Sequence, residues 1–374
     1  MSKPHLCMAH ECCGPYNAIG RVAMNGVNVA LEAGWKVTVI ANRIDESLLP
    51  RVEFVPLYVP PRVFALKWLT ARHFFQRAFA GRTFDVVHAH QPQVASLADV
   101  FQCHFLTRMA YQRHCLESGM GLNSVVMRLQ DPVILRAEDH YYRHWNPRTR
   151  MLYNSKLTRQ DFCGLYGKPP KEDVLLCAFR PFQGITEEER QAARLALVGP
   201  EHRGPVIGFL GGRDIRKGYT RLIEALPDQK DLFLLMGGLY CEGLEIPSLA
   251  GRFKALGLVS DTARFYAACD AFAAPSLYEP LGLVAFEAAA RGVPVFMTEE
   301  VGALPHMLEY GTGVTWRPGE PLSPLVHDMM ARRETFQAGA RRMAADLCEE
   351  KYGERLLSVY EDVLRSKRRE ERVA

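Results

Sequence analysis

The sequence predicts an α/β protein made of two doubly wound parallel sheets. Short apolar runs alternate with helical stretches along the whole chain of 374 residues. In the first half these runs are HLCMA, KVTVIA, VEFVPL, DVVHAH, MLYNS and VLLCAF, and in the second PVIGFLGG, DLFLLMGG, FKALGLV, AFAAPS, VPVFMT and GVTW. This β-α-β rhythm, read twice, is typical of parallel sheets covered by helices. The chain is also long enough for two domains of ordinary size.

The domain boundary is predicted between Phe182 and Gly204, where a polar helical stretch (TEEERQAARLAL) is bracketed by glycine and proline. We therefore expect an N-terminal domain over residues 1–182 and a C-terminal domain over residues 183–349. The amphipathic stretch KYGERLLSVYEDVLRS predicts a final helix within residues 350–368.

Composition indicates a soluble globular protein, with 48% hydrophobic and 24% charged residues. No apolar run reaches the ~18 residues of a membrane span, and the start MSKPHLCMAHECC lacks the apolar core of a signal peptide. We therefore expect a cytoplasmic protein. The ten cysteines include no C-x2-C pair, so we expect reduced thiols and no zinc site.

The charge is distributed unevenly along the chain. Residues 1–180 hold 22 of the 46 Lys and Arg and 14 of the 42 Asp and Glu, whereas the remainder holds 24 and 28. A basic first half suggests an anionic partner for the N-terminal domain. No nucleic-acid recognition module is visible, so we do not expect nucleic acid as that partner.

Two acids mark the most informative segment, SLYEPLGLVAFEAAARGVPVF. Glu279 lies in a Pro-Leu-Gly turn after the apolar run AFAAPS, and Glu287 lies within the helical stretch that follows. In open α/β sheets ligands bind at the carboxyl ends of the strands. Carboxylates there can accept hydrogen bonds from the vicinal hydroxyls of a ribose or a hexose. The alternative is a solvated pair of acids.

A glycine-rich turn opens the second half in the segment GFLGGRDIRKGYTRLIEAL. A buried strand leads into Gly211 and Gly212, and a helix is predicted to begin near Lys217 or Gly218. A diphosphate at that helix N-terminus would meet free backbone N–H groups, and Arg216 and Lys217 would add two cations. The alternative is a solvated basic turn. Because no D-x-D occurs in the sequence, we expect this countercharge to replace a metal ion.

The string PS-x-x-E-P-x-G-L-x-x-x-E-A resembles the signature of glycosyltransferase family 4, the retaining enzymes with the two-Rossmann GT-B fold. The resemblance implies that Glu279 faces the donor sugar, that Glu287 holds the nucleotide ribose, and that Gly282 and Leu283 contact the donor. It also implies two domains that face a cleft, with the final helix crossing back onto the N-terminal domain. No metal or other cofactor is implied beyond the nucleotide-sugar substrate.

The same family places its phosphate-binding Arg and Lys at the glycine-rich turn. Lys217 matches the family's lysine, and Arg216 matches the cation beside it in the lipopolysaccharide-core subset. Arg213 is a rival for the arginine role, because it directly follows Gly212. Further along, the resemblance implies that the backbone at Val259 reads the edge of the base.

In the first domain NAIGRVAMNGVNVALEAGWKVTVIA resembles the family's opening G-G-I-G-R segment, but Asn17 and Ala18 replace the two glycines. Ala18 keeps a backbone N–H but resists positive φ, so contact with phosphate from this loop is in doubt. Gly20 is then expected to supply the flexibility. Arg21 would face an anionic acceptor, or else lie as a surface residue on the first helical turn.

Three histidines compete for the catalytic wall of the first domain. His88 and His90 end the run DVVHAH, and His104 follows the run ADVFQC. The resemblance assigns the histidine that hydrogen-bonds the donor sugar to His104. An ordinary core role is the alternative for each of them.

Residues 60–82 combine aromatic and basic side chains around Trp68, with Arg72 and Arg77 among the cations. Such a helix can lie on an anionic membrane surface with its Trp and Arg at the level of the headgroups. The alternative is a crossover helix packed on the sheet. Several features of this domain faintly resemble the lipopolysaccharide-core glucosyltransferases, whose acceptors are anionic lipids.

The function expected from the sequence is metal-independent, retaining transfer of a sugar from a nucleotide sugar to a hydroxyl acceptor. The acceptor is a glycan, a lipid or a small molecule. Two alternatives stay open, a sugar-nucleotide epimerase on the same fold and a non-catalytic nucleotide-sugar-binding scaffold. A dinucleotide oxidoreductase is disfavoured because no G-x-G-x-x-G follows the first strand.

Overall fold

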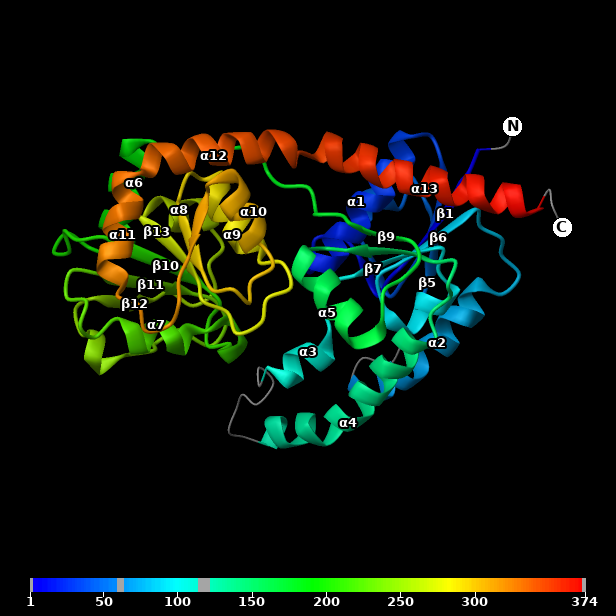
Figure 1. Cartoon of the computed structure of the whole chain (residues 1–374), viewed down its shortest axis with the longest axis horizontal. Helices are drawn as coiled ribbons and strands as arrows, with labels where there is room; N and C mark the ends of the chain where they lie inside the picture. Colours follow the sequence, from blue (N-terminus) through cyan, green and yellow to red (C-terminus); the bar gives the residue numbers. More distant parts are fainter. Residues whose placement is uncertain (1–2, 59–63, 114–121, 372–374) are drawn as a thin grey trace. The chain divides into compact units, whose positions relative to one another are not determined.

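The protein folds as two compact units, each built around its own parallel sheet (Figure 1). The computed structural model describes residues 3–58, 64–113 and 122–371. Unit 1 consists of Met1–Met109, Gly119–Cys177 and Glu350–Ala374, and unit 2 of Ala110–Ser118 and Ala178–Glu349.

Unit 1 contains a seven-stranded sheet in the order β5-β3-β1-β6-β7-β8-β9, with every neighbouring pair parallel. Its strands are β1 (His5–Ala9), β3 (Lys36–Ala41), β5 (Glu53–Pro56), β6 (Val86–Ala89), β7 (Val100–Cys103), β8 (Arg150–Tyr153) and β9 (Glu172–Val174). Two short strands, β2 (Cys12–Cys13) and β4 (Arg43–Ile44), form a separate parallel pair. In the chain β2 follows β1, and β4 follows β3. Its helices are α1 (Ala18–Glu32), α2 (Phe64–Phe79), α4 (Leu122–Arg143), α5 (Lys156–Tyr166) and α13 (Glu349–Glu371), and α3 (Thr107–Gln112) follows β7.

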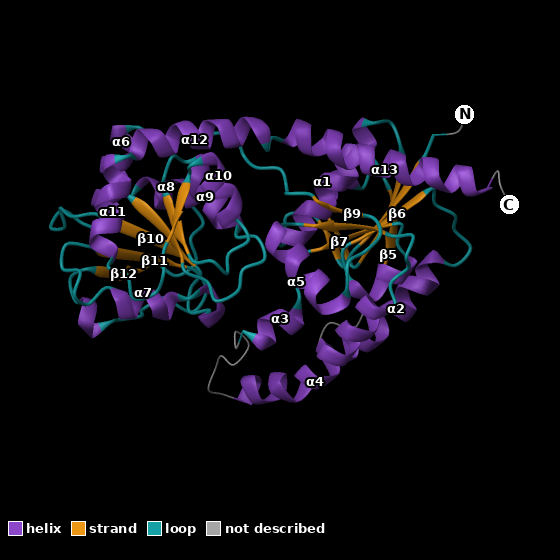
Figure 2. Ribbon diagram, viewed as in Figure 1, coloured by secondary structure: helices purple, strands orange, loops and turns teal. Residues whose placement is uncertain are grey.

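Unit 2 contains a six-stranded sheet in the order β12-β11-β10-β13-β14-β15, again all parallel (Figure 2). Its strands are β10 (Val206–Leu210), β11 (Phe233–Gly237), β12 (Phe253–Ala255), β13 (Ala271–Ala274), β14 (Val295–Met297) and β15 (Gly313–Thr315). Its helices are α6 (Glu187–Leu197), α7 (Tyr219–Ala225), α8 (Thr262–Ala267), α9 (Leu283–Ala290), α10 (Leu304–Tyr310), α11 (Leu322–Ala331) and α12 (Arg333–Asp346). The predicted fold class, two doubly wound parallel sheets, is confirmed.

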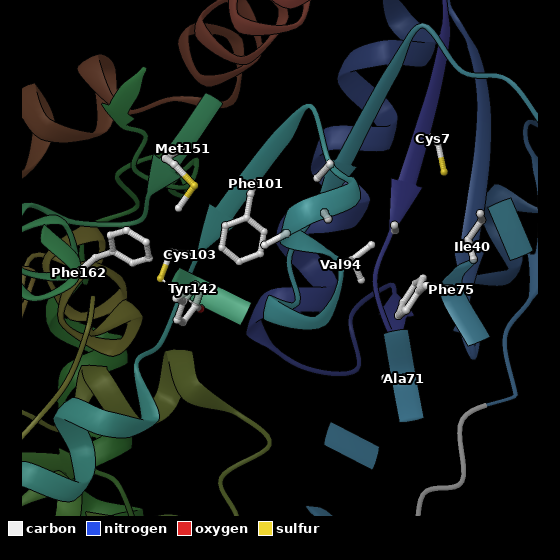
Figure 3. Packing of buried hydrophobic residues seen from close by; sticks show 14 of the residues in the cluster. Cys7, Ile40, Ala71, Phe75, Val94, Phe101, Cys103, Tyr142, Met151 and Phe162 are labelled. Carbon is white, nitrogen blue, oxygen red and sulfur yellow. Dashed lines mark hydrogen bonds between the residues drawn. The ribbon is translucent and has the colours of Figure 1, made fainter. Parts of the chain in front are cut away.

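The core of unit 1 lies on the face of its sheet that α2, α4 and α5 cover (Figure 3). Phe101 of β7 meets Tyr142 of α4 edge to face, with ring centroids 5.9 Å apart, and Tyr142 meets Phe162 of α5 at 5.1 Å. Alternate residues of a strand point to opposite faces, and the odd-numbered Cys7 and Ala9 of β1 join this same cluster. Tight packing here fixes the strand ends that carry the candidate residues of unit 1.

The opposite face of this sheet receives α1 and α13. Tyr360 of α13 is fully buried, and its hydroxyl lies 2.8 Å from Nδ1 of His88 on β6. A Cβ at Gly26 of α1 would come within 2.8 Å of Met8 and 3.1 Å of the Tyr360 hydroxyl. A larger residue at this position would displace the Met8 and Tyr360 side chains from their present packing.

One local prediction differs from the structure at strand level. The run VLLCAF was expected to form a strand, but β9 ends at Val174, and Leu175 to Cys177 continue as buried chain without a ladder of their own. Burial at a sheet edge accounts for the apolar run. The polar stretch before Gly204 does form helix α6, and Thr186 and Glu189 close its start as a capping box.

The expected membrane-facing role of Trp68 is wrong. The side chain is 8% exposed and packs in a cluster with Ile134, Ala137 and Tyr141 of α4. The Tyr141 hydroxyl donates a hydrogen bond to the Trp68 carbonyl at 2.9 Å. Residues 60–63 of the predicted segment lie outside the described residues. None of the helices in the described ranges has the length and apolar character needed to cross a bilayer.

We expect Tyr360→Ala to lower the free energy of unfolding of unit 1 by about 3–5 kcal/mol, because it removes a buried ring that packs against His88 and Trp35. Tyr360→Phe should cost less, about 1–3 kcal/mol, because only the hydrogen bond to His88 is lost. Urea unfolding of both variants measures the difference. Wild-type stability in Tyr360→Ala would show that α13 does not stabilise this sheet.

Candidate functional site

The glycine-rich turn of unit 2 is held against the end of β11. The N–H groups of Gly211 and Gly212 donate to the carbonyl of Gly237 at 3.0 and 2.9 Å. Gly212 has φ +57°, and a Cβ there would lie 2.1 Å from the carbonyl oxygen of Leu239. Backbone therefore approaches backbone at a distance that no other residue type permits.

The helix predicted to begin near Lys217 or Gly218 is α7, which has Gly218 as its N-cap, and the two cations lie in the turn just before it. Residues Ile215–Lys217 form a 3-10 turn, η3, that Asp214 caps by accepting from the N–H of Arg216 at 2.9 Å. Gly218 follows with φ +78°, and α7 begins only at Tyr219. A Cβ on Gly218 would lie 1.9 Å from the carbonyl oxygen of Pro275. The left-handed glycine thus separates the short turn from the helix and lets the loop after β13 come close.

The loop that carries Glu279 is fixed through its backbone on two sides. The N–H of Glu279 donates to the carbonyl of Glu300 at 3.0 Å, and the N–H of Gly302 donates to the carbonyl of Glu279 at 2.8 Å. On the other side the N–H of Leu277 donates to the carbonyl of Arg216 at 2.8 Å. Glu279 therefore has a defined position between η3 and the segment after β14.

Arg221 of α7 supports the same loop, and the sequence analysis missed it. Its guanidinium donates to the carbonyls of Pro275 and Ser276 at 3.2 and 3.1 Å and pairs with Glu300 at 3.6 Å. No pattern in the sequence singled it out, because Gly218 interrupts the helical path between Lys217 and Arg221. Its role is to hold the loop.

Glu279, Arg216 and Lys217, which the sequence analysis assigned separately to sugar and phosphate, meet at one point. Oε2 of Glu279 accepts from Lys217 and from Arg216, the latter at 3.1 Å, and Arg216 also reaches Asp214 at 3.2 Å. The Glu279 side chain is 14% exposed. Burial would raise the pKa of Glu279, but Lys217 and Arg216 outweigh it, so that its pKa is lowered and the carboxylate stays ionised.

Glu287 lies on α9, which begins after Gly282 in a left-handed conformation with φ +91°. Leu283 is the first residue of this helix and is half-buried. The hydroxyl of Tyr266 lies 3.2 Å from the carbonyl of Val284 and 3.3 Å from Oε2 of Glu287, and its one proton can be donated to either. Burial, and then the charge of Glu287, raise the pKa of Tyr266, which therefore remains a donor.

Glu287 also lines a pocket with an empty volume of about 380 Å³. The pocket combines cationic, hydroxyl and amide side chains around the carboxylate, a composition suited to a polar ligand. Its lining residues are Arg180, Pro181, Gln183, Thr262, Ala263, Tyr266, Glu287, Ala290 and Arg291. Glu279 does not line it.

The remaining predicted donor residues lie at strand ends of the same sheet. Arg213 is exposed, and its N–H donates to the carbonyl of Leu239 at 3.0 Å. Val259 is half-buried and packs against Gly237. A Cβ on Gly237 would lie 2.5 Å from a methyl carbon of Val259. Asp261, close by in the chain, caps α8 by accepting from the N–H of Arg264 at 2.9 Å. That acid thus has a structural role.

In unit 1 the substituted loop has a different construction from the one expected. Asn17 is the N-cap of α1, and its side chain accepts from the N–H of Gly20 at 2.7 Å. Ala18 is the first helical residue, so positive φ is not required of it. Asparagine in place of glycine thus satisfies an N–H of the first turn that the helix leaves unpaired.

We had expected Gly20 to supply flexibility to this loop, but it does not. It lies inside α1, where a Cβ would come within 2.8 Å of Cys12 Sγ and 2.9 Å of the Gly14 carbonyl. It is glycine because β2 packs against the helix. Arg21 is exposed on the first turn, and its N–H donates to the carbonyl of Asn17 at 3.1 Å.

The predicted histidines gather at the carboxyl ends of β1, β6 and β7. Nε2 of His104 lies 2.9 Å from Nδ1 of His90, and the His90 and His88 ring centroids lie 4.3 Å apart. His10, which the sequence analysis missed, lies edge to face with His90 at 5.7 Å. Its only signal was its position directly after β1. Within the described ranges, no three His, Cys, Asp or Glu side chains are arranged to hold a metal ion.

Burial keeps these histidines neutral. It lowers the pKa of His10, His88 and His104 to about 3, with smaller contributions from His104 and Lys67 at His10 and from His104 at His88. Burial and the neighbouring histidines lower the pKa of His90 well below its usual value. The cluster therefore offers uncharged imidazoles, which donate and accept hydrogen bonds.

Two doubly wound parallel sheets form the GT-B class of glycosyltransferase folds, and solved structures agree. WaaG, a glycosyltransferase involved in lipopolysaccharide biosynthesis, superposes with a TM-score of 0.71 over 94% of this chain and 99% of its own, at 17% identity. HepE of Anabaena in complex with UDP-glucose gives 0.66 over 96% and 99%, at 16% identity.

Residues 204–326 match the family of glycosyl transferases group 1, which confirms the resemblance to family 4. A D-inositol 3-phosphate glycosyltransferase of Mycobacterium sp. (strain KMS) is 29% identical over 53% of this chain and 47% of its own length. An uncharacterized glycosyltransferase of Methanocaldococcus jannaschii is 30% identical over 62% of each chain. The match thus spans about half to three-fifths of these relatives.

We expect the stability of unit 1 to fall as the pH drops below 6.5. The unfolded chain protonates its histidines near pH 6.5, whereas the folded cluster resists until about pH 3, so stability is present above 6.5 and is lost between these values. Each such histidine contributes up to about 1.4 kcal/mol per pH unit. His104→Gln should reduce the slope of the free energy of unfolding against pH by the equivalent of one bound proton. Urea unfolding from pH 7.5 to 4.5 measures this slope. An unchanged slope would contradict the neutral assignment of His104.

Proposed function

We propose that the protein transfers a sugar from a nucleotide sugar to a hydroxyl acceptor with retention of configuration, without a metal ion. The observation that carries the proposal is the meeting of Lys217, Arg216 and Glu279 at one edge of the unit 2 sheet. The group 1 family match covers this whole site. A retaining transferase of this kind needs no protein nucleophile, because the acceptor attacks from the face that the leaving group vacates.

Lys217 and Arg216 would bind the diphosphate and stabilise the charge that develops on it as the sugar departs. Such fixed cations supply the countercharge that a divalent ion provides in other transferases. Glu279, on a loop fixed through its backbone, would accept hydrogen bonds from the donor sugar.

Glu287 would bind the ribose hydroxyls at the mouth of its pocket. Tyr266, whose hydroxyl lies 3.3 Å from Oε2 of Glu287, would help to orient the carboxylate. HepE of Anabaena, solved with UDP-glucose, shows that this fold accommodates a nucleotide sugar. A binding screen with a panel of sugar nucleotides would identify the base and the sugar of this chain's own donor.

The acceptor is proposed to bind unit 1. Neutral His104 and its partner His90 offer hydrogen-bonding nitrogens, and Arg21 offers an exposed cation for an anionic acceptor. The basic surplus of the first 180 residues supports an anionic acceptor.

Lys217→Ala should lower the rate of sugar transfer by about two to three decades, or about 2–4 kcal/mol in the barrier, because a phosphate contact that strengthens in the transition state is lost. Incubation with a panel of sugar nucleotides, followed by release of nucleoside diphosphate and product analysis, measures it. Lys217→Arg, which keeps the charge, is the matched control. Glu287→Ala should instead weaken donor binding more than turnover.

Three outcomes would redirect the proposal. Near-normal rates in Lys217→Ala would contradict the phosphate assignment. Exchange of solvent deuterium into the sugar nucleotide without transfer would identify an epimerase. Donor binding without turnover on any acceptor would identify a non-catalytic scaffold.

We further propose that unit 1 contacts anionic membrane surfaces from the cytoplasmic side through α2. With Trp68 buried, the apolar part of this surface consists of Leu66 and Leu69, which are 44% and 58% exposed. Arg77 is exposed and Arg72 half-buried on the same helix. Lipid headgroups attract each such cation by about 1 kcal/mol.

Cosedimentation with anionic but not neutral vesicles is expected, and added salt should reduce it. Arg72→Glu with Arg77→Glu should weaken it several-fold. Arg317→Glu with Arg332→Glu makes the same change of charge at exposed sites of unit 2 and should leave it unchanged. Equal sedimentation with neutral vesicles, or none with either, would favour a soluble acceptor.

A further inference from the structure

Both proposed phosphate-binding cations are paired with carboxylates in the structure. Lys217 and Arg216 converge on the same oxygen, Oε2 of Glu279. Arg216 is paired a second time, with Asp214 at 3.2 Å. The side chains of Lys217 and Arg216 are only 22% and 21% exposed, so solvent screens these contacts incompletely.

The charges of this cluster cancel. Two cations face two carboxylates, so a diphosphate that arrives here meets a neutral cluster. It can bind Lys217 and Arg216 at full strength only after their contacts with Glu279 lengthen or break. The energy of those ion pairs is therefore subtracted from the binding energy of the phosphate.

Glu279 cannot withdraw far, because backbone hydrogen bonds to Glu300 and Gly302 fix its position in the loop. The lysine can move, because its ammonium sits on a flexible four-carbon stem. Exchange between the internal carboxylate and an external phosphate therefore occurs mainly at the lysine. Arg216 is held more firmly, since Asp214 and the carbonyl of Tyr278 also bind it.

We propose that Glu279 is the internal counter-ion of the phosphate site, which holds Lys217 and Arg216 in place until the diphosphate of the donor takes them over. This inference rests on the proposed function and extends it from the donor sugar to the release of the product. When the sugar has left, Glu279 competes with the nucleoside diphosphate for the two cations and so promotes its departure. Product release limits the turnover of many transferring enzymes.

The counter-ion role predicts an effect opposite to that of an ordinary binding residue. Glu279→Gln should bind inorganic pyrophosphate about tenfold more tightly than the wild type, because the competing charge is gone while the size of the side chain is kept. Pyrophosphate contains neither base nor sugar, so its binding reports the phosphate site alone. Isothermal titration calorimetry in the presence of a chelator measures it without metal.

Three variants separate charge from structure. Glu279→Asp keeps the charge and should stay near the wild-type affinity, whereas a merely structural role would change both variants alike. Glu299→Gln removes the same charge from an exposed pair with Arg317 and should shift the affinity by less than about twofold. Lys217→Ala should abolish the gain when it is combined with Glu279→Gln.

The outcomes distinguish the two levels of the proposal. Unchanged or weaker pyrophosphate binding in Glu279→Gln, with binding that still depends on Lys217, overturns the counter-ion role and leaves the phosphate assignment intact. Pyrophosphate binding that does not depend on Lys217, or no binding to either the wild type or Glu279→Gln, overturns both the counter-ion role and the phosphate assignment. Tighter binding of pyrophosphate and slower release of nucleoside diphosphate in Glu279→Gln establish the counter-ion role.

Discussion

The proposed donor site depends on one interaction, the ion pairing of Glu279 with Lys217 and Arg216. It joins the turn after β10 to the loop after β13, two segments about sixty residues apart in the chain. Electrostatic contacts of partly buried groups hold a defined geometry because few water molecules compete for them. The same contact orders the cations in advance, so less reorganisation is required when charge develops on a leaving group.

Glycine makes this pairing sterically possible. Gly212 and Gly218 bring their backbones against Leu239 and Pro275, where a Cβ would lie about 2 Å from a carbonyl oxygen. Positive φ at both positions turns the chain twice within seven residues. The short 3-10 turn between them then carries Arg216 and Lys217 toward the Glu279 loop, and Arg221 supports that loop from α7.

Unit 1 uses neutral groups where unit 2 uses charges. Burial keeps the four clustered histidines unprotonated, and Asn17 caps α1 where the resembled family has a glycine. A neutral, hydrogen-bonding wall suits a hydroxyl acceptor, because a buried charge would cost desolvation energy. In the proposed function, unit 2 supplies countercharge for the leaving group and unit 1 supplies hydrogen bonds.

The sequence by itself determined the repeated parallel α/β plan, the family resemblance and the residue types of the proposed donor site, because strand rhythm and motif spacing are local properties. Only the tertiary structure decided which of those residues touch. It paired Glu279 with Lys217, added Arg221 and His10, made Gly20 a packing residue, and buried Trp68 against α4. These outcomes depend on contacts between distant segments, which the order of residues along one segment does not encode.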